Sequence, residues 1–187
     1  HDSLPISLPG VDPATLQRVT DLAMASAHLA PRIAADLDLD PAIAGTAAVL
    51  QDAGILLVEH FRPAEAQAIR NRIHQGEPRV EVERSALGAT HEELGSALLA
   101  CWGLPLPLIT VVSRHHSRAE IIRNPLEMAG VLQIATCLLG KHMDLPVQTT
   151  TPSMEELDEM LLDPTARNRF DDWRRIAVQH HSEEEAC

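Results

Sequence analysis

Four side chains in this sequence could meet around a metal ion: Asp52, His91, His115 and His116. Carboxylate and imidazole groups bind divalent metals, and a catalytic metal site usually has three or more protein ligands with at least one open position. Asp52 lies in the most apolar stretch of the chain, residues 42–58, which we predict to be one central helix. An unpaired carboxylate would be costly there. We therefore expect Asp52 to have a partner, either a neighbouring helix terminus or histidine, or a metal ion.

Each histidine has a second interpretation. His91 follows Thr90 at the expected start of a helix, so it is either an exposed first-turn residue or a ligand. His115 and His116 are adjacent, and neighbouring residues on a helix point about 100° apart. Both can face one site only if the helix ends there, so we expect one of the two to lie at the surface.

The elements that must position these residues are predicted to be helices. Helix-start signals recur at Asp12-Pro13, Asp40-Pro41, Pro63, Thr90 with Glu93, Pro105 and Pro125. Pro31 lies inside the first predicted helix, where we expect a kink or break. Residues 79–87 alternate in polarity, but we assign them to a short helix because their neighbours are helical. With no confident strand pattern and few aromatic residues, the predicted fold class is all-α, a multi-helix bundle.

We divide the 187 residues into three parts. Residues 1–11 are predicted to be an extended lead-in, residues 12–145 a helical domain, and residues 146–187 a helical extension packed on that domain. Phe170 and Trp173 share one face of the second helix predicted in the extension. We expect this face to pack on the domain, and a homodimer contact through the C-terminal helices is the alternative.

The composition excludes several classes of protein. Apolar residues make up 45% of the chain and charged residues 22%, as in an ordinary soluble globular protein. The formal net charge of −12 argues against general binding to nucleic acid or to an anionic membrane. No secretory signal or membrane-spanning pattern is apparent, so we expect a cytoplasmic protein without a membrane partner. The three cysteines form no CxxC pair, which argues against a disulfide framework or a zinc knuckle.

Two stretches resemble one family. The string "LDPAIAGTAAVLQDAG", residues 39–54, is similar to the segment of HD-superfamily proteins that ends in His-Asp-x-Gly. The string "LGATHEELGSALLACWGLPLPLITVVSRHH", residues 87–116, resembles the HDOD domain, the HD-related output domain, including its Trp-Gly-Leu-Pro turn and closing His-His pair. The resemblance covers about residues 12–145. It implies an all-helical fold related to metal-dependent phosphohydrolases and used in bacterial signalling mainly as a non-catalytic or uncharacterised output module.

The sequence departs from the catalytic pattern of the superfamily at several positions. Gln51 stands where catalytic relatives have the His of His-Asp, and Ile55 stands where they have Lys. Their early His would fall near Asp21 or Leu22, and their late Asp near Thr136. The resemblance therefore implies a degenerate pocket with no catalytic residue and no cofactor. That pocket is formed by Gln51, Asp52, His91, His115, His116 and Thr136. If it holds an ion, we expect Mn, Fe, Zn or Ni bound by Asp52, His91, His115 and His116.

Three functions remain open. The first and favoured is a bacterial signal-transduction module that binds another signalling protein or itself, because Gln51 and Thr136 replace two ligands. The second is a residual metal-dependent phosphohydrolase, acting for example on a cyclic dinucleotide, in which the ion lowers the pKa of a bound water. The third is a sensor that holds a nucleotide without cleaving it. HDOD proteins usually carry another helical bundle before the region matched here, so the chain is expected to be a fragment, a processed form or a minimal variant.

Overall fold

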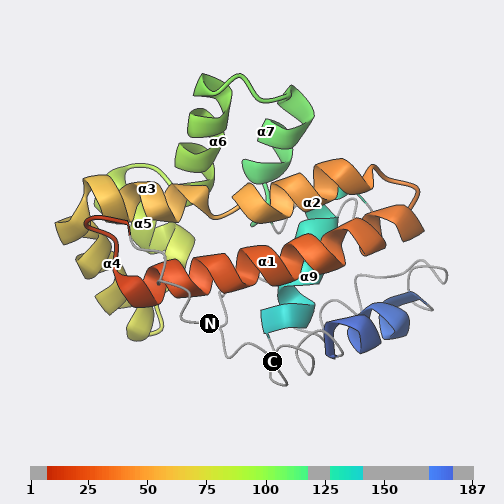
Figure 1. Ribbon diagram of the computed structural model, residues 1–187. Helices are drawn as coiled ribbons and strands as arrows, with labels where there is room; N and C mark the ends of the chain where they lie inside the picture. The colour runs from red at the N-terminus through yellow and green to blue at the C-terminus, as the bar shows by residue number, and fades with distance from the viewer. Residues whose placement is uncertain (1–7, 118–126, 141–168, 179–187) are drawn as a thin grey trace, which may run out of the picture.

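The computed structural model describes residues 8–117, 127–140 and 169–178 of the chain (Figure 1). Every regular element within these ranges is a helix, which confirms the all-α prediction. The labelled helices are α1 (Pro13–Asp36), α2 (Pro41–Leu50), α3 (Ala53–Phe61), α4 (Pro63–His74), α5 (Arg79–Leu87), α6 (His91–Cys101), α7 (Leu106–Val112) and α9 (Met128–Gly140). Residues 169–178 form a further helix, drawn in blue.

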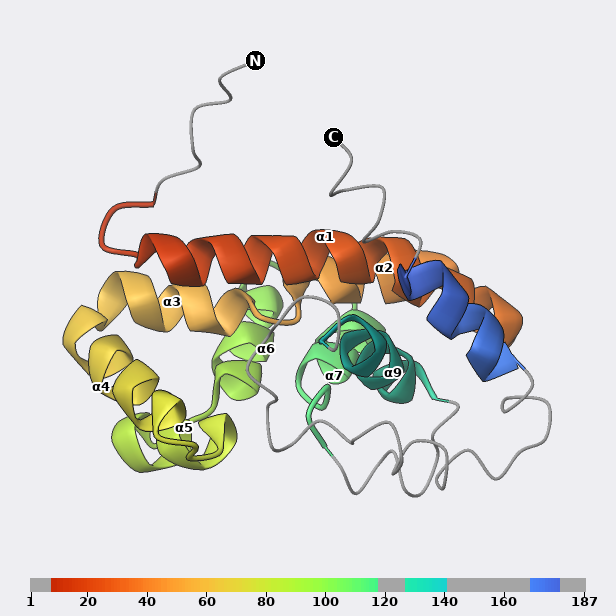
Figure 2. The ribbon, with the colours of Figure 1, turned by 90° about the horizontal axis from the view of Figure 1, so that it is seen from below.

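The longest helix, α1, packs closely on α2, and α3 continues from α2 along the same side of α1 (Figures 1 and 2). Side-chain caps fix the starts of these helices. The carboxylate of Asp12 accepts a hydrogen bond from the Thr15 backbone N–H at 2.8 Å, and that of Asp40 accepts one from Ala42 N at 2.8 Å. Both predicted N-caps are therefore confirmed, and Figure 1 shows that α1 and α2 run antiparallel.

Pro31 does not break α1, which continues to Asp36. The predicted break is therefore wrong. The proline ring lies against α2, where a Cβ on Gly45 would come within 3.1 Å of Pro31 Cγ. Packing of the ring into the space left by this glycine allows α1 to remain one helix despite the missing backbone donor.

The apolar stretch predicted as one helix over residues 42–58 is instead two helices that meet at Gln51 and Asp52. Asp52 leaves helical geometry, with φ −100° and ψ 12°. By length and hydropathy alone Pro41–Phe61 could cross a membrane, with a mean hydropathy of 1.5 over an 18-residue window. In the structure, however, these two helices pack on α1, α6, α7 and α9, as core helices of a folded domain do.

The main apolar core lies between α1, α2, α7, α9 and the helix of residues 169–178. Figure 2 shows α9 nearly end-on beneath the layer of α1 and α2, so that it crosses α1 steeply. Phe170 and Trp173 are among the largest fully buried side chains, and Trp173 Nε1 donates a hydrogen bond to Asp36 Oδ2 at 2.7 Å. These two aromatic side chains thus belong to the same core as α1 and α9. The homodimer contact stays a prediction, and the first helix predicted in the extension lies outside the described residues.

Candidate metal centre

The structure brings Asp52, His91, His115 and His116 together. One ligand-type atom from each lies within 4.8 Å of the others, and all four residues are buried. Asp52 Oδ1 and the Nε2 atoms of the three histidines have no hydrogen-bond partner within the described residues. Buried polar atoms without partners are uncommon in folded proteins. Four of them directed at one small region fit a bound cation, so the residues present suit a divalent metal.

The approach of α3 to α6 brings Asp52 and His91 into this cluster. A Cβ on Gly54 would lie 2.0 Å from the His91 carbonyl oxygen and 2.9 Å from Gly95 N, so glycine is required at this crossing. Asp52 stands two residues before Gly54, and its Oδ1 is 3.6 Å from His91 Nε2. His91 is 0% exposed, so the interpretation of this residue as an exposed first-turn histidine is wrong.

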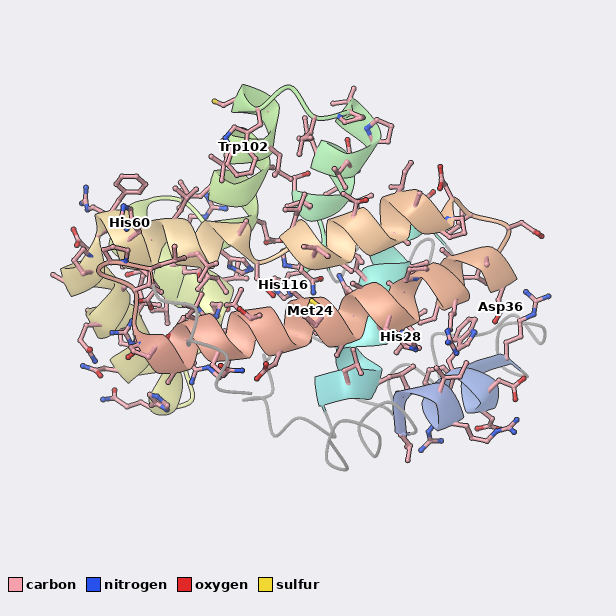
Figure 3. The ribbon with its side chains drawn as sticks, viewed as in Figure 1. Met24, His28, Asp36, His60, Trp102 and His116 are labelled. Atoms are coloured by element: carbon pink, nitrogen blue, oxygen red, sulfur yellow. The ribbon has the colours of Figure 1, made fainter. Side chains whose placement is uncertain are left out.

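His115 and His116 both face the cluster. Helix α7 ends at Val112, and the following residues form a turn rather than continuing the helix. The two rings lie 4.1 Å apart between centroids, and they are 5.3 and 5.0 Å from the His91 ring. The expectation that one of them lies at the surface is wrong, because the helix ends before the pair. In the view of Figure 3, His116 lies between α1 and the junction of α2 and α3.

A buried carboxylate fixes the orientation of His91. The Nδ1–H of His91 donates to Glu83 Oε2 at 2.6 Å, and the backbone N–H of His91 donates to the same oxygen at 2.9 Å. Burial of Glu83 opposes its charged form, but the hydrogen bonds and charge of His91 together with the charge of Arg79 lower the pKa of this carboxyl. Arg79 lies 3.3 Å from the other carboxylate oxygen. A carboxylate behind a histidine in this way leaves Nε2 as the ligand atom and strengthens it as a donor to a metal.

The other two histidines are held by main-chain contacts. His115 Nδ1–H donates to the Val112 carbonyl at 2.8 Å, and the backbone N–H of His116 donates to Glu92 Oε1 at 2.9 Å. Glu92 Oε1 is also 4.0 Å from His115 Nδ1. The bond to Val112 occupies Nδ1 and leaves His115 Nε2 facing Asp52, at 3.8 Å from Oδ1.

The protonation states favour metal binding at two of these residues. Burial opposes the charged form of Asp52, but the nearby imidazoles of His115 and His91 hold its pKa below the ordinary value. Burial, and then the charges of His115 and His91, lower the pKa of His116 well below the ordinary range. Burial also disfavours protonated His115, yet Asp52 outweighs this and raises the pKa of His115. Because a histidine binds a metal in its neutral form, metal binding at His115 competes with its protonation.

The two other predicted pocket residues differ in their surroundings. Gln51 is 2% exposed, and neither atom of its amide has a described partner. Thr136 on α9 is only partly buried, and its place in the pocket stays a prediction. The buried polar residue of α9 is Gln133, which is 2% exposed with an equally unpartnered amide, and Ser26 Oγ on α1 is buried without a partner. Sequence reasoning missed both, although each is a polar residue on an otherwise apolar helix face.

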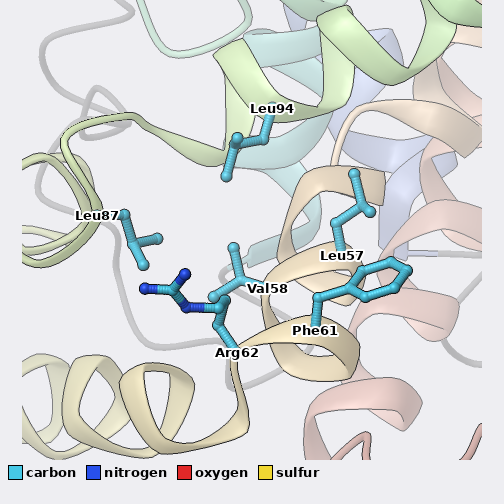
Figure 4. Close-up of a pocket in the computed structure, with 6 residues that line it drawn as sticks. All are labelled: Leu57, Val58, Phe61, Arg62, Leu87 and Leu94. Atoms are coloured by element: carbon cyan, nitrogen blue, oxygen red, sulfur yellow. The ribbon is translucent and has the colours of Figure 1, made fainter.

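A separate apolar pocket lies at the other end of α3 (Figure 4). Its lining residues are Leu57, Val58, Phe61, Arg62, Leu87 and Leu94. None of the four candidate metal ligands lines it, so a molecule bound there would not touch the histidine cluster.

Comparison with known proteins identifies the class to which this fold and cluster belong. The model of the HDOD domain matches residues 7–118, so the chain belongs to the HDOD domain family. A crystal structure from Shewanella amazonensis SB2B, named "Putative phosphohydrolase", superposes with a TM-score of 0.68 at 19% sequence identity. The match covers 94% of this chain but 63% of that one, so the chain spans less than two thirds of its structural relative. No curated protein matches the sequence significantly.

Proposed function

We propose that this HDOD domain binds one divalent transition-metal ion and serves as a signalling module rather than as a hydrolase. The observation that carries the proposal is the set of four buried, unpartnered ligand atoms from Asp52, His91, His115 and His116. Three imidazoles and one carboxylate suit Zn, Fe, Ni or Mn. The ligand set therefore supports the alternative in which an ion binds, in preference to the expectation of no cofactor. When bound, such an ion acts as a Lewis acid and lowers the pKa of a coordinated water.

The burial of the ligands supports a non-catalytic role. The four residues are between 0% and 8% exposed. A phosphodiester has to reach the ion to be cleaved, whereas metal sites with four protein ligands are typical of structural centres. Gln51, which stands beside Asp52, is a neutral amide that binds hard cations poorly. The role of this chain's own residues would be to hold the ion and to exclude water from it.

Hydrolysis is the second candidate function. It is favoured by the fold shared with the relative named as a phosphohydrolase, and by a ligand set that leaves coordination positions open in a six-coordinate ion. A sensor that binds a nucleotide at the same site without cleaving it is a related alternative. Under the favoured proposal the domain works in the bacterial cytoplasm through contact with a signalling protein or a second copy of itself. The net charge of −12 supports a protein partner over nucleic acid or anionic lipid.

Metal content tests the site on which both candidates rest. Protein purified without chelator is expected to contain about one equivalent of a transition metal. His91→Ala should lose the ion, whereas His74→Ala, at an exposed position, should keep it. A folded wild-type protein without metal would refute the site.

Activity is measured on the same samples with bis(p-nitrophenyl) phosphate, a general phosphodiester substrate. We expect no turnover above that of free metal. Turnover that disappears in Asp52→Ala would replace the signalling proposal with the hydrolase.

A further inference from the structure

Three uncharged polar side chains are buried without partners outside the four-ligand cluster. Ser26, Gln51 and Gln133 are 0%, 2% and 2% exposed. The Ser26 hydroxyl oxygen and both atoms of each glutamine amide have no hydrogen-bond partner within the described residues. Native interiors rarely contain so many unpaired polar atoms, because each would lose its hydrogen bonds to water on folding. These side chains are therefore expected to meet a hydrogen-bonding molecule.

The packing of the helices directs these side chains into one interior. Ser26 lies on α1, Gln51 caps the end of α2, and Gln133 lies on α9, and each of these helices packs on the other two. A Cβ added to Gly45 on α2 would lie 3.1 Å from Pro31 Cγ and 3.9 Å from the Ala27 carbonyl oxygen on α1, so Gly45 lies opposite this part of α1. Because α1 and α2 are antiparallel, Gln51 lies about 1.7 helical turns further along, beside the turn of α1 that directly precedes Ser26. Gln51 also directly precedes the ligand Asp52.

We infer that Ser26, Gln51 and Gln133 line an uncharged compartment beside the metal ligands that takes a small oxyanion, of the class of inorganic phosphate. The inference rests on the proposed metal site and names what that site binds besides the ion. On this view the pocket is not merely a metal site that has lost ligands. Gln51, which stands where catalytic relatives have a histidine, would itself help to bind the oxyanion.

The chemistry of the three side chains selects this class of ligand. A second divalent cation would find no carboxylate among them to offset its charge. An apolar group would leave the amides unpaired. Two amide NH₂ groups and a hydroxyl can donate to the oxygens of an anion.

The charges around the cluster also favour an anion. Asp52 is the single carboxylate among the four ligands, so a divalent ion held there keeps net positive charge toward the compartment. The two other carboxylates nearby contact the histidines away from Nε2. Glu83 meets the Nδ1 of His91 and is paired with Arg79, and Glu92 accepts from the backbone of His116.

The test uses the full chain loaded with Mn²⁺. Metal stoichiometry is measured first, and inorganic phosphate is then titrated by calorimetry, with ³¹P relaxation reporting approach to the paramagnetic ion. Wild-type protein is expected to bind one Mn²⁺ and to bind phosphate with enhanced ³¹P relaxation. Gln51→Leu and Gln133→Leu should each keep one Mn²⁺ but lose phosphate affinity by a factor of about ten, the worth of one or two hydrogen bonds to a charged group.

Gln133→Glu is a nearly isosteric variant that replaces donors with a negative charge. It should abolish phosphate binding and raise the Mn²⁺ stoichiometry above one, whereas Gln75→Glu at the exposed end of α4 should change neither. One bound Mn²⁺ without phosphate binding would show that water alone fills the compartment and would overturn this inference while leaving the metal site intact. Equal phosphate affinity in the Gln51 and Gln133 variants would overturn it as well. Absence of Mn²⁺ from folded wild-type protein would instead refute the metal site and the inference together.

Discussion

Gly54→Ala should move Asp52, which directly precedes α3, away from His91 at the start of α6. The added Cβ would lie 2.0 Å from the carbonyl oxygen of His91 and 2.9 Å from Gly95 N. Carbon–oxygen contacts settle at about 3.3 Å, so α3 and α6 must move apart by roughly 1.3 Å. Both groups are backbone and cannot rotate away. Overpacking of this kind costs about 1–3 kcal/mol, occasionally more, and the better helix propensity of alanine returns about 1 kcal/mol.

We therefore expect urea unfolding to show a loss of about 2 kcal/mol in the free energy of unfolding of Gly54→Ala. Metal affinity, measured by calorimetry, should fall far more than this loss explains, because metal–ligand distances tolerate only about 0.2 Å of change. Gly76→Ala is the matched control. Its φ of +90° makes alanine strained, at about 1–2 kcal/mol, but no atom lies within 4 Å of the new Cβ and it is remote from the cluster. A Gly54→Ala protein with wild-type stability and metal affinity would refute the crossing as the device that joins Asp52 to His91.

Two further predictions concern named carboxylates. Glu83→Gln should weaken metal binding about 10–100-fold in chelator competition, because the carboxylate that orients His91 is lost, and unchanged affinity would refute that role. Asp12 accepts hydrogen bonds from the Thr15 backbone N–H and hydroxyl, which lower the Asp12 pKa, so its stabilising effect is present above the unfolded pKa and is lost as pH falls through the folded pKa. Asp12→Ala should thus cost about 1 kcal/mol in urea unfolding at neutral pH and progressively less below about pH 4, and a pH-independent difference would contradict this.

Local signals in the sequence predicted most of the fold correctly. The N-caps at Asp12 and Asp40 depend on residues two or three positions away. Thr90 and Glu93 form the predicted capping box, in which each side chain accepts from the backbone of the other. Such bonds close within one turn, so the sequence contains all of their determinants.

The errors arose where tertiary packing decides the outcome. Pro31 stays inside α1 because Gly45 of another helix makes room for its ring. His115 and His116 share a site because α7 ends at Val112, which no strong stop signal marks. Gln133 was missed because its burial depends on the rotation of α9 against its neighbours. Helical periodicity places a side chain on a face, but it does not reveal which neighbour covers that face.

The hydrogen bond between Trp173 and Asp36 joins residues 137 positions apart, and it sets the order in which the domain can be completed during synthesis. Translation adds roughly 5–20 residues per second, so about 7–27 s separate the emergence of the two partners. During that interval α1 and α2 can pair, since few residues separate them. The part of the core that Phe170 and Trp173 fill remains open to solvent. The nascent chain therefore exposes an apolar surface near Asp36 for several seconds. This time is long enough for a chaperone to bind that surface before Trp173 packs against it.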